Sequence, residues 1–208
     1  MPLTLILIRH GQTKWNNEHR MQGQTDIPLN LLGAKQAERM ARQLEAYPIQ
    51  SFYSSPLKRA HRTARIIHAH HHDAPLILHD DLIERSFGTG EGKTYEEITH
   101  LFPVMAFSRS WDHPYFQIPG GERLIDVYRR GTRFMDELVQ KEQNKTVAIV
   151  AHGVIIRCII SFLMKFPLNA NMFYELKNTS LTVIRIPQQG PPELHVLNHT
   201  HHLGEIGD

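Results

Sequence analysis

A short apolar segment that ends in Arg-His-Gly constrains the fold of this chain more than any other feature. Residues 3–8 are almost entirely Leu and Ile, which is typical of a strand buried on both faces. Arg9 and His10 follow at the carboxyl end of that strand, the end at which open α/β sheets bind ligands. Gly11 then permits a sharp turn or a close approach to a ligand. The segment favours two hypotheses equally: His10 as a nucleophile toward phosphoryl groups with Arg9 as an anion clamp, or a strand that merely ends in polar residues.

Segments typical of strands and of helices alternate along the rest of the chain. Further strands are expected at residues 51–54, 75–79, 146–151, 180–186 and 193–197. Helices are expected at about residues 30–46, 55–70, 94–110 (in short pieces), 122–143 and 154–166. The alternation predicts an α/β fold: a three-layer sandwich with a mostly parallel central sheet and helices on both faces, in a single domain over residues 1–208.

Three local features complete this prediction. Ser55 precedes Pro56 and is expected to be the N-cap of the helix that follows. Residues 14–29 are polar and are expected to form a long loop, and loops of this length are often functional. The polar residues at the C-terminus are expected to be disordered.

Composition argues against several classes of protein. The net charge is +2 and no basic run resembles a nucleic-acid-binding stripe. Cys158 is the single cysteine, so an internal disulfide is excluded and a reducing compartment is favoured. No apolar segment has the length of a membrane span. We therefore expect a soluble cytoplasmic protein that binds neither nucleic acid nor membrane, while the oligomeric state, a homodimer included, stays open.

The pattern of an apolar strand, His-Gly and then a helix occurs twice, at His10-Gly11 and at His152-Gly153. If the two strands are parallel neighbours, both imidazoles emerge at the same edge of the sheet. Arg59 lies in the first turns of a helix after another strand, so it would approach that edge as well. Two histidines and two arginines in one pocket repel one another unless an anion separates them, and a phosphate suits the planar guanidinium. The pattern predicts a phosphate site.

Phosphoryl transfer requires in-line attack, positive charge on the phosphate oxygens and a proton for the leaving group. A neutral His10 is suited to the attack, and Arg9, Arg59 and His152 can supply the charge, so neither a metal ion nor another cofactor is expected. Glu84 lies after an apolar pair and before a glycine-containing loop. It is the candidate general acid, although a glutamate in a loop is more often simply solvated.

These residues lie in motifs that resemble the histidine phosphatase superfamily, also called phosphoglycerate mutase-like. The motifs follow the family order over roughly residues 3–160: Arg9-His10-Gly11 with Asn16, Gln22-Gly23, Ser54 to Arg59, Glu84 to Gly88, Pro119 to Glu122 and Val150 to Gly153. The resemblance implies the phosphoglycerate mutase-like fold.

The resemblance also implies roles for individual residues. His10 would be the phosphohistidine nucleophile and Glu84 the proton donor. The rest of the phosphate pocket would be Arg9, Arg59 and His152. The substrate side would be lined by Asn16, Gln22, Gly23 and Gly153.

The resemblance leaves phosphatases and mutases to be distinguished. Mutases of this family usually carry a longer insertion with extra cations after the loop that carries the acid. Here only residues 93–118 lie between that loop and Pro119. Within this stretch, residues 107–116 would form an apolar lid. We therefore expect a metal-independent phosphomonoester hydrolase that acts through a phosphohistidine on a small phosphorylated metabolite. The alternatives are a cofactor-dependent mutase-type phosphotransferase and a non-catalytic phosphate-binding protein.

Histidine-rich segments at residues 68–72 and 201–202 raise the question of a metal site. Adjacent histidines at a helix end point in different directions, so a solvated surface is the favoured interpretation. No metal ligands are expected.

Overall fold

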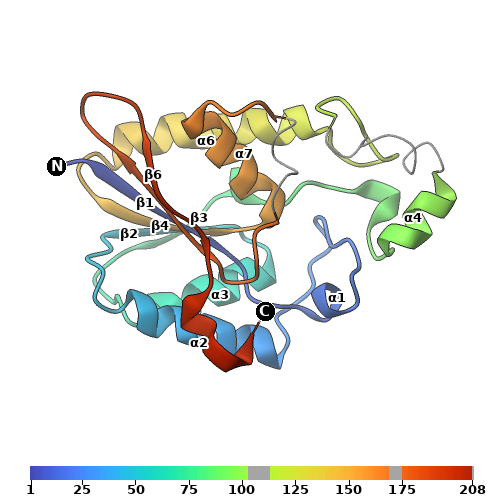
Figure 1. Ribbon diagram of the computed structural model, residues 1–208, viewed down its shortest axis with the longest axis horizontal. Helices are drawn as coiled ribbons and strands as arrows, with labels where there is room; N and C mark the ends of the chain where they lie inside the picture. The colour runs from blue at the N-terminus through green and yellow to red at the C-terminus, as the bar shows by residue number, and fades with distance from the viewer. Residues whose placement is uncertain (103–112, 169–174, 208) are drawn as a thin grey trace.

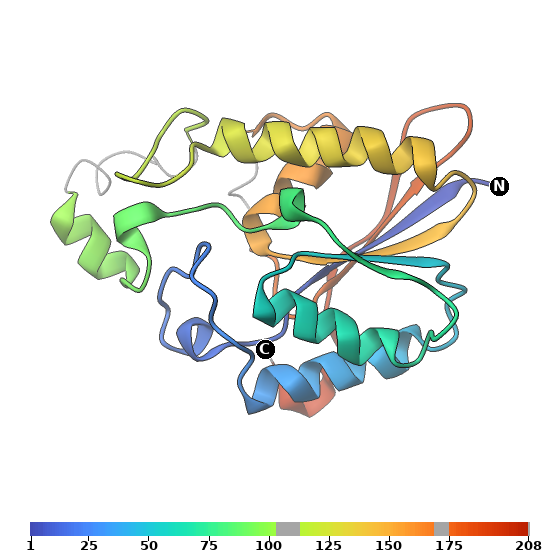
Figure 2. The same ribbon diagram turned by 180° about the vertical axis from the view of Figure 1, so that it is seen from behind.

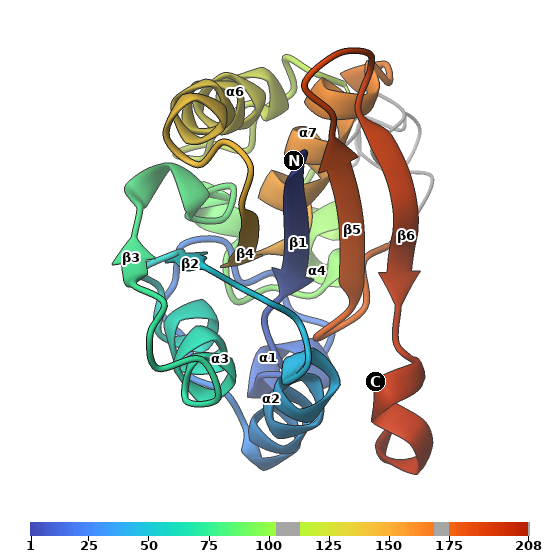
Figure 3. The ribbon, with the colours of Figure 1, turned by 90° about the vertical axis from the view of Figure 1, so that its left-hand side faces the viewer.

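A six-stranded sheet in the order β3-β2-β4-β1-β5-β6 lies at the centre of the protein. We describe it from a computed structural model that covers residues 1–102, 113–168 and 175–207. Figure 3 shows the strands side by side in this order. They are β1 (Leu3–Arg9), β2 (Ser51–Ser54), β3 (Leu76–Leu78), β4 (Thr146–Ala151), β5 (Leu181–Ile186) and β6 (Glu193–His199).

The strands that precede the candidate site residues run parallel. β1 pairs with β4, β4 with β2, and β2 with β3, all in parallel, whereas β5 is antiparallel to both of its neighbours. The register places Arg9 opposite Ala151. Since each of these residues is the last of its strand, β1 and β4 end side by side. The mostly parallel sheet predicted from the sequence is confirmed.

Helices cover both faces of the sheet, as the alternating pattern predicted. α2 (Leu31–Leu44) and α3 (Lys58–His68) lie on one face, and α6 (Leu124–Lys141) and α7 (Gly153–Met164) lie on the other (Figures 1 and 2). The short helices α1 (Lys14–Asn17) and α4 (Tyr95–Leu101) lie in connections beyond one end of the sheet (Figure 1). Three 3₁₀ segments complete the described helices: η1 (Asp80–Leu82), η2 (Gly88–Gly90) and η5 (His201–Ile206).

The sheet separates two apolar cores, and β1 contributes to both. Leu5 and Leu7 pack toward α6 and α7, whereas Ile6 and Ile8 pack toward α2 and α3. Successive side chains of a strand point to opposite faces. A strand with a core on each face therefore has no polar alternation, which explains the uninterrupted apolar run at residues 5–8.

The predicted N-cap at Ser55 is wrong. α3 begins at Lys58, and its N-cap residue, Leu57, makes no side-chain capping hydrogen bond. Ser55 instead lies before the helix, and its Oγ is 2.8 Å from Nε2 of His152. The same Oγ also accepts from the backbone N–H of Leu57 over 3.3 Å, so Ser55 combines a local hydrogen bond before the helix with a long-range contact at the sheet edge.

Two segments expected to lack structure are partly helical. Residues 14–29 contain α1, which begins with a capping box between Thr13 and Asn16. The C-terminal segment forms η5, with Leu203 buried and the side-chain amide of Gln36 donating to the carbonyl of Gly207 over 3.1 Å. Most of the proposed apolar lid at residues 107–116, and the helical pieces expected beyond Pro103, lie outside the described residues.

The remaining expectations concern membranes, metals and the cysteine. In the described ranges, no helix has both the length and the apolar character needed to cross a membrane, and no group of three or more metal-ligating side chains could hold an ion. The histidine-rich segment is not simply solvated, because the ring of His71 packs on Phe52 with centroids 5.4 Å apart. Cys158 is a core residue, and burial raises the pKa of its thiol to about 12.

Phe134 of α6 packs against two aromatic rings, that of Tyr53 in β2 and that of His79 just after β3. Its ring centroid lies 5.7 Å from Tyr53 and 4.8 Å from His79. Phe134→Ala should lower the free energy of unfolding by about 3–5 kcal/mol, because it leaves a cavity in the core. Leu31→Ala is the control: Leu31 is 86% exposed, so its effect should stay within about 0.5 kcal/mol. Urea unfolding measures both, and equal values for the two variants would contradict the packing described here.

Candidate active site

The parallel ends of β1 and β4 bring two histidines into contact. His10 and His152 each follow the last residue of their strand, and their ring centroids lie 5.1 Å apart in an edge-on arrangement. Both rings are buried, with exposed fractions of 3% and 0%. The structure therefore brings together the two imidazoles that are 142 positions apart in the chain, since 152 − 10 = 142.

A pocket of about 460 Å³ opens beside His10. The residues singled out from the sequence that line it are Arg9, His10, Asn16, Gln22, Gly23, Arg59, Glu84 and Gly153. His152 does not line the pocket; its ring lies behind, against His10. The wall also includes residues to which the sequence assigned no site role: Trp15, Phe87, Tyr95, Arg157 and Glu175.

The tautomer of His10 follows from one hydrogen bond. Its Nδ1 lies 2.7 Å from the carbonyl oxygen of Gly11. A carbonyl oxygen can only accept, so Nδ1 carries the proton and Nε2 keeps its lone pair. Burial and the positive charges of Arg59 and Arg9 hold the pKa of His10 well below its ordinary value. At neutral pH His10 is therefore an uncharged imidazole with a nucleophilic Nε2.

The backbone of His10 is fastened by two residues that no sequence motif indicated. Asn178 donates from Nδ2 to the carbonyl of His10 over 2.9 Å, and the N–H of Thr179 donates to the carbonyl of Arg9 over 3.0 Å. Thr179 has a φ of 52°, in the left-handed region that β-branched residues rarely adopt. The strained backbone thus lies where the chain supports the histidine. In the sequence, the only indication of a role for Asn178 and Thr179 is that they directly precede a segment expected to form a strand of the sheet.

Gly11 is required by a close approach between backbones. A Cβ on Gly11 would lie 2.4 Å from the carbonyl oxygen of Gly33 in α2, and a Cβ on Gly33 would lie 2.0 Å from that of Gln12. The N–H of Gly11 donates to Oγ1 of Thr63 in α3 over 3.0 Å. The turn after His10 is therefore packed directly on two helices. The sequence predicted that Gly11 serves a sharp turn or an approach to a ligand, whereas the structure requires it for an approach to protein backbone.

Arg59 is held rigidly and keeps one donor unused. Its Nη1 and Nη2 donate to the carbonyls of Thr25 and Gly23 over 2.9 and 2.6 Å. Its buried Nε has no hydrogen-bond partner among the described residues. Burial lowers the pKa of Arg59 to about 10, so the guanidinium is still charged at neutral pH.

His152 also has an unsatisfied polar atom. Its Nε2 is hydrogen-bonded to Ser55, whereas its buried Nδ1 meets no partner in the part of the chain described. Burial, and next the charge of Arg59, hold the pKa of His152 well below its ordinary value. Buried polar atoms without partners cost free energy, whether they are donors or acceptors. An anion that supplied acceptor oxygens to Arg59 and His152 would remove that cost.

Glu84 and Arg9 face each other across the start of α7. A Cβ added to Gly153 would lie 3.9 Å from both Nε of Arg9 and Oε2 of Glu84. The carboxylate of Glu84 accepts from the backbone N–H of Val154 over 3.1 Å and of Ile155 over 3.3 Å. Glu84 therefore lies at the N-terminus of α7, the end of a helix that favours negative charge. Arg9 donates from Nη1 to Glu175 over 3.4 Å and to the carbonyl of Leu176.

The side-chain amides of Asn16 and Gln22 are oriented by Thr13. Oδ1 of Asn16 accepts from the N–H of Thr13 over 3.1 Å, and Oε1 of Gln22 lies 3.0 Å from its hydroxyl. With both carbonyl oxygens engaged, the amide nitrogens remain available, and neither hydrogen-bonds to another residue in the described ranges. Both residues line the pocket, so these nitrogens are potential donors to an anion there.

Glu91, to which the sequence assigned no role, joins two loops of the pocket. Its carboxylate accepts from the backbone N–H groups of Gln24, Thr25 and Phe87 over 3.0, 2.9 and 3.0 Å. The first two belong to the loop whose carbonyls hold Arg59. Glu91 therefore determines indirectly where Arg59 is placed.

The arrangement as a whole is suited to a tetrahedral oxyanion. Fixed donors from Arg9, Arg59, Asn16 and Gln22 surround or border the pocket, and a neutral imidazole nitrogen is available at its base. Opposite charges shorten and strengthen such hydrogen bonds. The site can therefore bind a phosphoryl group and present a nucleophile to it.

Comparison with known proteins agrees with this chemistry. The family model described as histidine phosphatase superfamily (branch 1) matches residues 5–200. The chain is 33% identical to phosphoglycerate mutase-like protein 4 of Arabidopsis thaliana, in an alignment that covers 98% of this chain and 88% of that protein. It is 35% identical to phosphoserine phosphatase 1 of Hydrogenobacter thermophilus, in an alignment that covers 97% of this chain and 95% of that protein. It is similar to the crystal structure of phosphoserine phosphatase from Entamoeba histolytica in complex with 3-phosphoglyceric acid (TM-score 0.85, 34% identity, 97% of this chain and 99% of that one).

The buried histidines predict a specific sensitivity to acid. In the folded protein the pKa of His10 and that of His152 are lowered, whereas in the unfolded chain both titrate near 6.5. Above that pH neither state gains a proton; below it only the unfolded chain does, so the free energy of unfolding falls as the pH is lowered. Between pH 6.5 and 5.5, the free energy of unfolding of His10→Gln should fall by on the order of 1 kcal/mol less than that of the wild type.

The control for this prediction is His195→Gln, because His195 is exposed on β6. Urea unfolding of the three proteins at pH 7.5, 6.5 and 5.5 measures the effect. A pH dependence of His10→Gln that coincides with those of the wild type and the control would contradict the buried neutral state of His10.

Proposed function

Because this chain belongs to the histidine phosphatase superfamily, we propose that it is a phosphatase that hydrolyses phosphomonoesters of small metabolites through a phosphohistidine at His10. The observation that carries the proposal is the hydrogen bond from Nδ1 of His10 to the carbonyl of Gly11, which leaves Nε2 unprotonated beside the pocket. An enzyme of phosphatase or mutase type follows from the family alone; the intermediate and the direction of transfer are the proposed part.

In the first proposed step, Nε2 of His10 attacks phosphorus in line with the ester oxygen. The bond from phosphorus to that oxygen breaks, and Glu84 donates a proton to it, so the product alcohol leaves neutral. Arg9 and Arg59 offset the charge of the non-bridging oxygens. His152 supports His10 from behind the pocket, and its Nδ1 would be a donor if the Ser55 hydroxyl donates to its Nε2. The phosphoryl group is then covalently bound to His10.

In the second proposed step, water attacks the phosphohistidine. The carboxylate of Glu84 accepts a proton from the water, the bond from phosphorus to Nε2 breaks, and inorganic phosphate leaves. His10 returns to its neutral form and Glu84 to its protonated one. The positive charge in this scheme comes from the protein, so the proposed route requires no metal ion and no cofactor.

Four residues are proposed to hold the substrate. The amide nitrogens of Asn16 and Gln22 would donate to phosphate oxygens. Gly23 and Gly153 would allow the substrate to approach the backbone, since a Cβ at position 153 would project between Arg9 and Glu84.

Hydrolysis is favoured over mutase activity by two observations. Only residues 93–118 separate the loop after Glu84 from Pro119, with few cations to retain a second phosphate. Relatives that match nearly the whole chain include a protein named phosphoserine phosphatase. A further relative is named mutase-like, which keeps the mutase as the alternative. Phosphoserine and 3-phosphoglycerate are therefore the first substrates to test.

The proposed intermediate predicts the behaviour of His10→Ala. Wild-type protein in excess EDTA should release inorganic phosphate from p-nitrophenyl phosphate and phosphoserine, and an alkaline quench should trap acid-labile phosphate on the protein. His10→Ala should lose at least about 1,000-fold in kcat and trap none, whereas the exposed control His195→Ala should resemble the wild type. Fast interconversion of phosphoglycerates with little free phosphate would favour the mutase, and wild type that binds phosphate without turnover would favour a binding protein.

The proposed acid predicts a dependence on the leaving group. The ratio kcat/KM reports the steps up to phosphorylation of His10, in which Glu84 acts only as an acid. Glu84→Gln should therefore lower kcat/KM for phosphoserine by about 100-fold or more, but by less than about 10-fold for p-nitrophenyl phosphate, since nitrophenolate leaves without a proton. Equal losses for the two substrates would contradict the acid role.

A further inference from the structure

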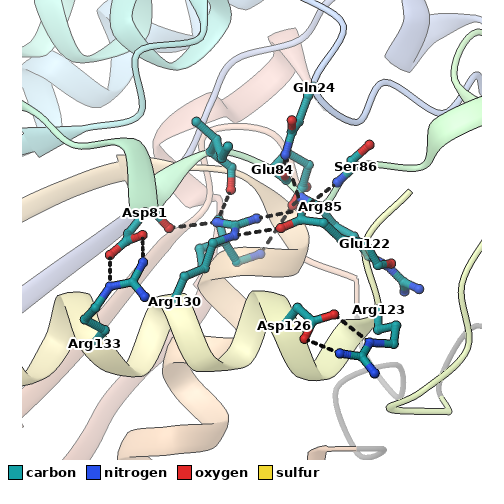
Figure 4. Close-up of polar contacts among 12 residues, drawn as sticks. Gln24, Asp81, Glu84, Arg85, Ser86, Glu122, Arg123, Asp126, Arg130 and Arg133 are labelled. Atoms are coloured by element: carbon teal, nitrogen blue, oxygen red, sulfur yellow. Dashed lines mark hydrogen bonds and ion pairs between the residues drawn. The ribbon is translucent and has the colours of Figure 1, made fainter. Parts of the chain in front are cut away.

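The segment that carries Glu84 is bound to helix α6 by Arg130 (Figure 4). Nη1 of Arg130 donates to the carbonyls of Asp81 and Ile83 over 2.7 and 2.6 Å. Its Nε and Nη2 form a two-point ion pair with Glu122, each over 3.2 Å. Arg130 is buried. All three of its side-chain nitrogens are engaged, either with the chain just before Glu84 or with Glu122, the residue that binds the chain just after it.

Glu122 binds the other side of the same segment. Its Oε2 accepts from the backbone N–H of Ser86 over 2.8 Å and from Nε2 of Gln24 over 3.2 Å. The same Nε2 of Gln24 lies 3.1 Å from the carbonyl of Glu84. The pair of Glu122 and Arg130 therefore contacts the backbone immediately before and after Glu84, and Gln24 connects it to the carbonyl of Glu84.

These contacts matter because the segment from Ile83 to Phe87 belongs to no helix or strand. Backbone groups in such a segment depend on side chains for their hydrogen bonds. The carboxylate of Glu84 reaches the pocket from this segment and meets the N-terminus of α7. A displacement of about 1 Å in a catalytic group can lower a rate by about 100-fold, so the position of Glu84 depends on what holds its backbone.

We propose that Glu122 and Arg130 are positioning residues for Glu84, an inference that rests on the acid role given to Glu84 in the proposed function. They touch neither the pocket nor a substrate in it; they act by fixing the backbone from which the carboxyl reaches the leaving oxygen. Removing Arg130 therefore affects chemistry most where the leaving group needs a proton.

The same helix offers a matched control. Arg133 lies three residues after Arg130 and pairs with the side chain of Asp81, in the same η1 segment. Its guanidinium is largely exposed and makes no contact with the backbone around Glu84 (Figure 4). Arg133→Met thus removes one guanidinium and one ion pair from α6, as Arg130→Met does, but the ion pair it removes is the one to Asp81 and residues 83–86 keep their contacts.

The experiment compares kcat/KM for phosphoserine and for p-nitrophenyl phosphate in Arg130→Met, Arg130→Lys and Arg133→Met. Arg130→Met should lose about 10-fold or more for phosphoserine but less than about 3-fold for p-nitrophenyl phosphate. Arg130→Lys keeps the positive charge but lacks the planar guanidinium that binds Glu122 at two points. Its kcat/KM for phosphoserine should lie between those of the wild type and Arg130→Met. Arg133→Met should match the wild type for both substrates. Melting temperatures show whether the variants are folded.

A double variant separates positioning from a general structural role. If Arg130 acts through Glu84, the loss specific to phosphoserine should disappear when Arg130→Met is added to Glu84→Gln. Equal losses of Arg130→Met for the two substrates, or full additivity with Glu84→Gln, would overturn the inference while the proposed function stands. A Glu84→Gln variant without leaving-group dependence would instead overturn the acid role. If Arg130→Met does not fold, Glu122→Gln allows the same comparison and decides it by the same criteria.

Discussion

The parallel pairing of β1 with β4 is the constraint on which the rest of the molecule depends. Its register runs from Thr4 opposite Thr146 to Arg9 opposite Ala151, so both strands end at the same level. A slip by one residue would turn every side chain of a strand to the opposite face. Because β1 faces an apolar core on each side, the two cores hold its position in the sheet. The contact between the histidines that follow these strands is thus secured by packing well away from the pocket.

This arrangement brings histidines and arginines close enough to repel one another when all are charged, and the fold reduces that repulsion in two ways. The imidazoles of His10 and His152 are buried in their neutral form, since burial and the neighbouring arginines both lower their pKa. Two backbone carbonyls accept hydrogen bonds from Nη1 and Nη2 of Arg59. Its Nε and the Nδ1 of His152 are left without partners among the described residues. Unsatisfied buried polar atoms of this kind are expected where a protein keeps a site ready for a ligand.

Carboxylates and amides outside the pocket give order to loops that contain little regular secondary structure. Glu91 accepts from backbone N–H groups of two such loops, Glu122 binds the chain after the candidate acid, and Asn178 binds the carbonyl of His10. Each uses a side chain to satisfy a backbone group that a helix or strand would otherwise satisfy. The pocket is therefore positioned by a surrounding layer of polar residues that need not touch a substrate, together with the sheet edge.

The sequence by itself determined the order of most strands and helices along the chain, the layered α/β fold and eight of the residues that line the pocket, because apolar periodicity and motif spacing are local properties of the chain. Only the tertiary structure decided how those residues are used. It placed Ser55 on His152, 97 residues away, instead of at the N-cap of its own helix, and Glu84 on the N–H of Val154, 70 residues away. It also assigned the proton on His10. Such contacts depend on how separate elements pack in three dimensions, and a hydrogen bond between distant residues leaves no periodic signal in the sequence.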